Sequence, residues 1–467
     1  MLRSARPKPT PKSILSELLT VALAFGTAIL ALPALSGEPV TADRSVFLKG
    51  GFLVDPDLGS VERRNLLIVD GKIEGTPTRQ PKNFAGRVID VSGQYVIPGL
   101  RDLHVHSMVQ GRITGPPFML GSDVAARRMT QVGVVGMLDL LHLENYIFPM
   151  RDRQRSGDLD GADIFAAGAV LTAPGGHGTE YGLPARLVES PDDARRHVSE
   201  LAELKADVVK LIYEHPTEGV ETWREELPTI ELDELKAAVD AAKKHGLKTV
   251  VHIRSWRDIR DSAEVGADAV THLPSEPMPA DLPALLARRG TVVIPTLARG
   301  DMDFVRAGAL DGPLLQRVTG PEVLADYRDW DRSSERSLSF TAAMARAQRH
   351  RADAMAALHR AGVRFAAGTD SGNSWTVHGV SLHRELELMV DAGLGPRDAL
   401  RAATTEAGRF LGQSWGLESG HDGSVVVLAE SPLDDIRNTR EISWVIHRGE
   451  PVDLQAWHAP APPPTSM

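Results

Sequence analysis

The sequence predicts an α/β fold, a (β/α)8 TIM barrel with β-rich segments at both chain ends. Two observations support this prediction. Short apolar runs separated by turn signals fill the two ends of the 467-residue chain, whereas its middle alternates apolar strand-like runs with amphipathic helical stretches. Eight strands that alternate with helices are typical of a barrel whose strands are parallel and whose helices lie outside.

The first 36 residues differ in kind from the rest of the chain. Basic residues precede the apolar run 18–32, and the small residues Ala34 and Ser36 stand where a signal peptidase would cut. The run is shorter than the roughly 20 residues that span a bilayer. We therefore predict a signal peptide over 1–36 and a secreted or periplasmic protein with no stable membrane anchor after cleavage. An uncleaved anchor is the alternative interpretation.

Composition narrows the classes of partner and ligand. The formal net charge is −10 and no dense stripe of Lys and Arg offsets it, which argues against binding to nucleic acid and favours a small-molecule substrate. The chain contains no cysteine, so disulfides and thiolate chemistry are excluded and any metal must have nitrogen and oxygen ligands. A homo-oligomer is compatible with the sequence.

The elements of the expected barrel lie between the two β-rich ends. The expected strands are 100–104, 134–138, 163–167, 207–212, 249–253, 269–272, 291–296 and 364–367. The expected helices are 190–204, 232–245, 256–265, 342–361 and 396–411, each with apolar residues near a period of 3.6. Residues 300–341 form the longest insertion, expected either as a lid over the barrel mouth or as a solvated surface loop.

Candidate site residues stand where these strands end. His104 and His106 lie two apart on a strand, so both rings point the same way and can bind one metal ion, although an isolated pair of this kind is more often two half-buried sheet histidines. In such barrels the chemistry gathers at the carboxyl ends of the strands. The other candidates at strand ends are Lys210, His252, His272 and Asp370.

Lys210 interrupts the apolar strand 207–212, where an unpaired ammonium group would be costly. Burial lowers the pKa of a lysine, and a neutral amine can take up carbon dioxide to form a carbamate whose two oxygens can bridge two metals. The alternative is a lysine with a buried stem and a solvated head, but the neighbouring candidates favour the carbamate. Imidazoles and a carboxylate suit zinc, and similar divalent ions stay open.

The chain resembles the amidohydrolase superfamily, in its imidazolonepropionase-like or prolidase-like branch of metal-dependent hydrolases. The segments that carry the resemblance are Val96-Ile-Pro-Gly-Leu-Arg-Asp-Leu-His-Val-His106, Ala173-Pro-Gly-Gly-His-Gly178, Gly266-Ala-Asp-Ala-Val-Thr-His272 and Gly368-Thr-Asp370, together with 207–211, 249–252 and 378–386. It implies two divalent ions, zinc by preference: one on His104, His106 and Asp370, the other on His252 and His272. An N6-carboxylysine at Lys210 would bridge them.

The resemblance also implies a domain organisation. Residues 37–97 and 416–457 would pair into one small β-sandwich, 98–415 would form the barrel, and 458–467 would be a Pro-rich tail. Two segments depart from the family pattern: Gly423-Ser424 replaces the usual Ala-Asp, and Tyr213-Glu-His-Pro216 replaces a Gly-rich continuation of the fourth strand. Substrates of relatives therefore do not transfer to this chain.

The expected mechanism uses a hydroxide that bridges two close metal ions and attacks a carbonyl. Asp370 would take the proton and deliver it to the leaving group. His177, in a glycine-rich loop, is expected to contact the substrate carbonyl or the oxyanion, or else to be a surface histidine in a turn. Weaker candidates for substrate contact are Tyr213, Arg254, His215 and His378. Asp102 and Asp139 could orient the ligands, or could be ordinary strand-end residues.

Four functions are compatible with this pattern. The first is an amidohydrolase that cleaves an amide C–N bond, in a dipeptide or an N-acyl amino acid. A lactonase, esterase or cyclic amidase would use the same binuclear site. A mononuclear deaminase would leave Lys210 unused and would want a His-Glu pair where this chain has His252-Ile-Arg-Ser255. A non-catalytic binding protein would be expected to have lost ligands, whereas all six are present.

Overall fold

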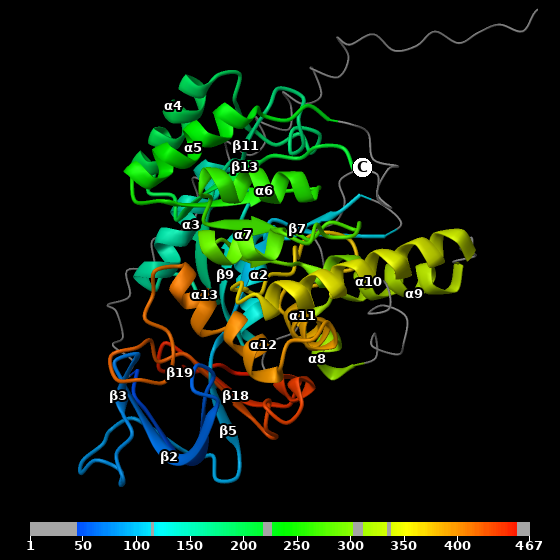
Figure 1. Ribbon diagram of the computed structural model, residues 1–467. Helices are drawn as coiled ribbons and strands as arrows, with labels where there is room; N and C mark the ends of the chain where they lie inside the picture. Colours follow the sequence, from blue (N-terminus) through cyan, green and yellow to red (C-terminus); the bar gives the residue numbers. More distant parts are fainter. Residues whose placement is uncertain (1–43, 114–115, 218–226, 302–311, 334–337, 455–467) are drawn as a thin grey trace, which may run out of the picture. The chain divides into compact units, whose positions relative to one another are not determined.

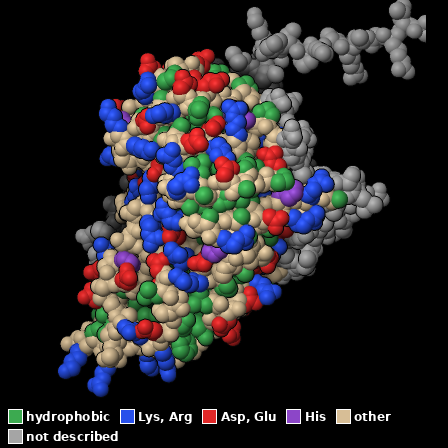
Figure 2. Space-filling view, in the orientation of Figure 1, with side chains coloured by type: hydrophobic (Ala, Val, Ile, Leu, Met, Phe, Trp, Pro, Cys, Tyr) green, Lys and Arg blue, Asp and Glu red, His purple; other side chains and the backbone are tan. Residues whose placement is uncertain are grey.

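The computed structural model describes residues 44–113, 116–217, 227–301, 312–333 and 338–454. The predicted signal peptide and the Pro-rich tail lie outside these residues. Among the helices that are described, none is long and apolar enough to cross a membrane. Acidic and basic side chains are mixed over the face of the described chain seen in Figure 2, and they do not separate there into fields of one sign.

The middle of the chain forms the expected ring of parallel strands. Its strands are β6 (Leu100–Val105), β9 (Val134–Asp139), β10 (Asp163–Ala166), β13 (Val208–Ile212), β14 (Lys248–His252), β15 (Ala269–Thr271) and β16 (Val292–Ile294). The eighth member is the extended segment 364–367, which bridges β16 through Val293 and Phe365. All eight expected strands are therefore found within a residue or two of their predicted positions.

Two backbone hydrogen bonds complete the ring where regular pairing is absent. The amide of Asp207 donates to the carbonyl of Ala166 at 3.0 Å, which joins β10 to the start of β13. The amide of Leu103 donates to the carbonyl of Ala367 at 2.9 Å, which joins the last segment back to the first strand. One apolar cluster takes a residue from every strand, among them Leu103 and Val208, and is the barrel interior.

The helices pack on the outside of this ring. The four predicted helices 190–204, 232–245, 256–265 and 342–361 appear as α4 (Pro191–Glu203), α5 (Leu232–Lys244), α6 (Trp256–Val265) and α10 (Leu338–Arg360). Helices that the sequence did not predict are α2 (Ser122–Thr130), α3 (Glu144–Ser156), α7 (Leu282–Arg289) and α11 (Val380–Asp391). Local caps explain two of the helix starts, because the hydroxyls of Ser190 and Ser255 accept hydrogen bonds from amides in the first turn.

One expectation about the helices was wrong. The stretch 396–411 is not one helix but two, α12 (Pro396–Ala402) and α13 (Thr405–Phe410). The chain breaks because the carbonyls of Ala402 and Ala403 accept hydrogen bonds from Ala367 and Arg101 of the barrel, at 2.9 and 2.8 Å. A helix that continued through this point would need the same carbonyls for itself.

The insertion 300–341 is not a solvated loop where it is described. It contains α8 (Pro313–Val318) and α9 (Pro321–Ser333), with a short 3-10 helix η2 (Leu297–Gly300) before it. Leu315, Val318 and Tyr327 are almost fully buried there, so the insertion has its own apolar contacts. Asp326 of α9 accepts a hydrogen bond from the amide of Ile113 at 2.7 Å. Residues 302–311 are outside the described part, and a lid function stays a prediction.

The two chain ends share one sheet, in the order β19-β18-β17-β5-β1-β2-β3, with β4 beside β1 (Figure 1). The N-terminal strands are β1 (Val46–Asp55), β2 (Ser60–Val69), β3 (Lys72–Gly75), β4 (Arg87–Asp90) and β5 (Tyr95–Pro98), and the C-terminal ones are β17 (Val425–Leu428), β18 (Ile442–His447) and β19 (Glu450–Pro451). Antiparallel pairing of β5 with β17 joins the ends, around a core that includes Leu48, Ile68, Val96 and Val427. The predicted domain boundaries remain predictions.

Asp163 of the barrel strand β10 forms the main ionic link to the small sheet. Its carboxylate lies 2.7 Å from a guanidinium nitrogen of Arg448 and 3.7 Å from one of Arg101. Burial opposes ionisation of Asp163, but His447, Arg448 and Arg101 hold the pKa of its carboxyl well below the usual range. Arg101 is fully buried and also stacks on Trp415 at 3.5 Å.

We predict that Asp163→Asn lowers the free energy of unfolding at pH 7 by about 3 kcal/mol, because it leaves the buried Arg101 uncompensated. Asp90→Asn is the control, since its ion pair with Lys49 is exposed and screened by solvent, so its effect should be small beside that of Asp163→Asn. Because the folded pKa of Asp163 is depressed, its contribution is present above about pH 4 and is lost as the pH falls further. Equal losses in both variants, measured by denaturant unfolding, would contradict this account.

Candidate metal centre

The six predicted ligands lie together at the carboxyl ends of the barrel strands. Each comes from a strand or from the turn that follows it: His104 and His106 from the first, Lys210 from β13, His252 from β14, His272 from β15 and Asp370 from the eighth segment. All six line one cavity of about 420 Å³. The barrel thus brings into one cavity residues that are up to 266 positions apart in the sequence, as His104 and Asp370 are.

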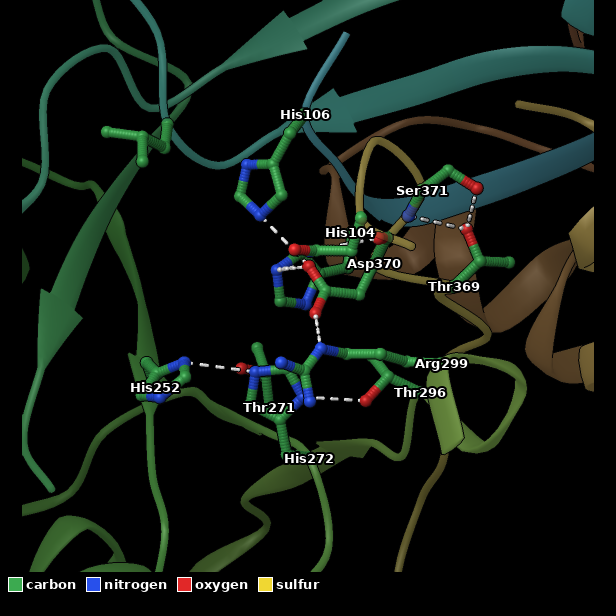
Figure 3. Close-up of polar contacts among 12 residues, drawn as sticks. His104, His106, His252, Thr271, His272, Thr296, Arg299, Thr369, Asp370 and Ser371 are labelled. Atoms are coloured by element: carbon green, nitrogen blue, oxygen red, sulfur yellow. Dashed lines mark hydrogen bonds and ion pairs between the residues drawn. The ribbon is translucent and has the colours of Figure 1, made fainter. Parts of the chain in front are cut away.

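Asp370 is the centre of the first group. Its Oδ1 lies 3.2 Å from Nε2 of His104 and 2.9 Å from Nε2 of His106. Its Oδ2 lies 2.8 Å from Nε of Arg299, in the 3-10 turn after β16. Figure 3 shows the carboxylate between His106 on one side and Arg299 on the other. Two imidazoles and a carboxylate oxygen converge here in a manner that suits a divalent cation.

The second group is formed by His252 and His272. Nδ1 of His252 lies 3.0 Å from Nε2 of His272, and Nδ1 of His272 lies 2.6 Å from the hydroxyl of Thr296, which fixes that ring. The rings of His104 and His272 are 5.1 Å apart, so the two groups are neighbours. This spacing allows two cations in one cavity.

Lys210 is buried on the inner face of the barrel, as its place two residues after Val208 requires. Its ammonium nitrogen lies 3.3 Å from the hydroxyl of Thr271. Burial lowers the pKa of Lys210 to about 7. A large fraction of the amine is therefore neutral near pH 7, which is the form that can become a carbamate.

Burial also sets the charge of the other ligands. It lowers the pKa of His252 to about 4, and it holds the pKa of His104 and of His272 well below 6.5. Burial works against ionisation of Asp370, yet His104, His106 and Arg299 hold the pKa of this carboxyl well below its usual range. At neutral pH His104, His252 and His272 are therefore neutral and Asp370 is ionised, and these are the forms that bind metal.

Three residues of the site have left-handed backbones although they are not glycines. They are His272, Thr296 and Asp370, with φ of 79°, 50° and 61°. Backbone hydrogen bonds hold two of them, since the amide of His272 donates to Ile294 and that of Asp370 to His104, both at 2.8 Å. Such strain concentrates where a side chain must be aimed against the preference of the chain.

Asp102 and Asp139 support the ligands from behind. The carboxylate of Asp102 accepts two hydrogen bonds from Thr369, the residue before Asp370: one from the backbone amide at 3.0 Å and one from the side-chain hydroxyl at 2.6 Å. Asp139 accepts a bond from the amide of Ser107 at 2.9 Å, next to His106. Both are fully buried. They fix the backbone on either side of the first group, in the positions that the sequence suggested for orienting residues.

The match to the amidohydrolase family model covers residues 95–452. The chain belongs to the amidohydrolase family. It is accordingly a hydrolase of carbon–nitrogen bonds, in a family that generally uses divalent metal ions.

Individual relatives either have low sequence identity over most of the chain or match only a short part of it. The ochratoxinase of Aspergillus niger is 22% identical over 440 residues, which cover 85% of this chain and 84% of that protein. A dihydroorotase of Pelotomaculum thermopropionicum is 41% identical over only 83 residues, 18% of this chain and 19% of its own length. A Xaa-Pro dipeptidase structure with bound methionine has a TM-score of 0.69 at 22% identity and covers 88% of this chain and 100% of that one. These likenesses support the fold of this amidohydrolase.

The structure shows where the weaker candidates for substrate contact lie. His177 lines the cavity; its Nδ1 is bonded to Glu180, and its ring is 4.7 Å from that of His252. Its contact with the substrate stays a prediction. Arg254 lines a second cavity beside the ligands. His215 pairs with Asp258 at 2.7 Å.

Two predicted substrate contacts lie elsewhere. Tyr213 follows directly after β13 and packs in the apolar core, and its hydroxyl donates to Asp261 at 2.9 Å. It is one residue out of phase with the inward-facing Ile212, so substrate contact was the wrong expectation. His378 is fully buried, and its Nε2 lies 3.3 Å from the carbonyl of His106. It supports the loop after the first strand and is not among the residues that line either cavity.

Glu214 and Arg299 are site residues that the sequence reasoning missed. Glu214 is 5% exposed, and its Oε2 lies 3.1 Å from Nε2 of His252. His252 faces His272 with its Nδ1, whereas Glu214 contacts its Nε2. Glu214 therefore orients the ring from the side away from the proposed ion. Alternation along the strand could have found it, because 210, 212 and 214 share a face. For Arg299, in an irregular turn, the sequence carries no comparable signal.

We predict that Glu214→Gln lowers the affinity for zinc by about 10- to 100-fold, because His252 loses the carboxylate that fixes its orientation and tautomer. The purified variant would be titrated with zinc in the presence of a competing chelator. Glu264→Gln, on the exposed side of α6, is the control and should leave the affinity unchanged. Wild-type affinity in Glu214→Gln would remove Glu214 from the support of the metal centre.

Proposed function

We propose that this amidohydrolase binds two divalent ions, zinc by preference, and hydrolyses the amide bond of a dipeptide or an N-acyl amino acid. The observation that carries the proposal is the arrangement of two ligand groups around a buried lysine in one cavity. His104, His106 and Asp370 would hold one ion, and His252 and His272 the other. Lys210, as N6-carboxylysine, would bridge them.

The residues present fit this pair of ions. Nδ1 of His252 and Nε2 of His272 lie 3.0 Å apart, and burial keeps both rings neutral. A cation next to both would use their two lone pairs at once. Nitrogen and oxygen ligands in a cavity without cysteine suit zinc and similar ions. A buried lysine with a pKa of about 7 supplies the neutral amine that carboxylation requires.

Two ions bound here would make hydroxide available near neutral pH and polarise the substrate carbonyl. Asp370 is placed to accept the proton of the attacking water at one carboxylate oxygen and to pass it to the leaving nitrogen. Arg299 holds the other oxygen, so the carboxylate cannot rotate freely. His177 lines the same cavity with its ring fixed by Glu180, and in this proposal it contacts the carbonyl oxygen of the substrate.

We predict that the purified protein contains about two equivalents of zinc per chain and that a chelator abolishes amide hydrolysis, which added zinc restores. Lys210→Ala should lose one or both ions and at least about 100-fold in kcat/KM, because the bridging group is gone. Lys236→Ala is the control, since this lysine is exposed on α5. Elemental analysis of the three proteins tests this. A metal-free active enzyme, or an unchanged Lys210→Ala, would refute the proposal.

We also propose that the enzyme is secreted or periplasmic and that residues 1–36 are removed on export. The support is the order of basic, apolar and small residues at the N-terminus. Intact-mass measurement of the protein purified from its native host should give a chain that begins near Gly37. A chain that retains residues 1–36 in the membrane fraction would favour the uncleaved anchor.

A further inference from the structure

One short turn carries side chains that reach both ligand groups of the metal centre. This turn, residues 296–300, consists of η2 and the residue before it. The hydroxyl of Thr296 lies 2.6 Å from Nδ1 of His272, in the second group, and Nε of Arg299 lies 2.8 Å from Oδ2 of Asp370, in the first group (Figure 3). The orientation of two proposed ligands therefore depends on where this turn lies.

The backbone of the 296–300 turn is strained at its first residue. Thr296 has a φ of 50°, in the left-handed region that β-branched residues rarely adopt. A residue stays in such a conformation only when contacts from the surrounding structure hold it there. The turn therefore needs support from another part of the chain.

Glu385 of α11 provides this support. Its Oε1 accepts a hydrogen bond from the amide of Leu297 at 3.0 Å, and its Oε2 accepts one from the amide of Ala298 at 2.7 Å. These are the first two amides of η2, and the first amides of a helix have no carbonyl partner within that helix. Glu385 is fully buried, where a carboxyl group is costly unless its oxygens are used. Here the turn uses both oxygens.

The helix that carries Glu385 has anchors of its own. Nε2 of His383, two residues before Glu385, lies 2.9 Å from the carbonyl of Val132, directly before the second barrel strand. Its Nδ1 lies 3.0 Å from the hydroxyl of Thr439. These contacts fix α11 independently of the 296–300 turn, so that the helix can serve as the support from which the turn is held.

We propose that Glu385 is a positioning residue for both ligand groups: by holding the 296–300 turn, it aims Thr296 at His272 and Arg299 at Asp370. The proposal rests on the two-ion site of the proposed function. It assigns the metal centre a support on α11, and it implies that loss of this one carboxylate loosens both groups together.

The test uses Glu385→Gln, which keeps the size of the side chain. An amide group can accept only one of the two backbone hydrogen bonds, because its NH2 is a donor. Burial raises the pKa of Glu385 to about 8, while the two amide hydrogen bonds lower it. The measurements are therefore made at about pH 9, where most of the carboxyl groups of the wild-type enzyme are ionised.

Glu385→Gln should lower the affinity for zinc by roughly 10- to 100-fold, measured against a competing chelator. In the zinc-loaded variant, kcat for N-acetyl-leucine or glycyl-leucine should fall by a similar factor, with KM within about 3-fold of the wild-type value. If Glu385→Gln does not fold, Glu385→Asp, which draws both oxygens back by one methylene, should show the same joint loss. Glu387→Gln is the matched control and should change neither quantity: Glu387 is a carboxylate of the same helix, 9% exposed, and pairs with Arg384 and Arg440.

Two double-mutant cycles separate positioning from a general loss of stability. If Glu385 acts through the turn, Glu385→Gln should cost little further zinc affinity in a Thr296→Ala background. It should likewise cost little further kcat in an Arg299→Met background. Full additivity in both cycles would show that Glu385 acts elsewhere and would overturn the proposal.

A crystal structure of metal-free Glu385→Gln gives a readout that needs neither bound zinc nor turnover. Thr296 and Arg299 should both have moved away from His272 and Asp370. This result would support the positioning role even if the wild-type enzyme hydrolysed no amide, so the two proposals can fail separately. A folded variant with both contacts intact, or with wild-type zinc affinity, would overturn the inference.

Discussion

Closure of the barrel by its eighth segment is the constraint on which the site depends. Leu103 pairs with Ala367 and His104 with Asp370 through backbone hydrogen bonds of 2.9 and 2.8 Å. These two bonds set the last segment in register with the first strand and force Asp370 into a left-handed backbone. Its carboxylate then meets both histidines of the first strand. A slip of one residue would turn Asp370 away from them.

The electrostatics of the site follow from its depth in the barrel. Burial keeps His104, His252 and His272 neutral and lowers the pKa of Lys210 to about 7, while His104, His106 and Arg299 keep Asp370 ionised. A mononuclear deaminase would have no use for a lysine buried among the ligands. Arg299 contacts Asp370 and also lines both cavities. Its substitution would therefore leave Asp370 without the guanidinium that holds one of its carboxylate oxygens.

The ligands could be predicted from sequence because strand alternation and the chain direction fix which side chains reach the carboxyl end of a parallel strand. The same rule would have added Glu214 to the predicted site and excluded Tyr213 as a substrate contact. Counted from Lys210, Glu214 lies on the same face of the chain and Tyr213 on the opposite one. Arg299 could not be predicted, because a 3-10 turn gives no periodic pattern. The break between α12 and α13 could not be predicted either. It arises because amides of the barrel donate hydrogen bonds to the carbonyls of Ala402 and Ala403, and these contacts join residues far apart in the sequence.

The central claim is a two-ion site bridged by a carboxylated Lys210. It is tested most directly by a crystal structure of the zinc-loaded protein with anomalous data at the zinc edge. The account predicts two anomalous peaks roughly 3.5–4 Å apart, one bound by His104, His106 and Asp370 and the other by His252 and His272, with density for a carbamate on Lys210 between them. A single peak with an unmodified Lys210 would contradict it.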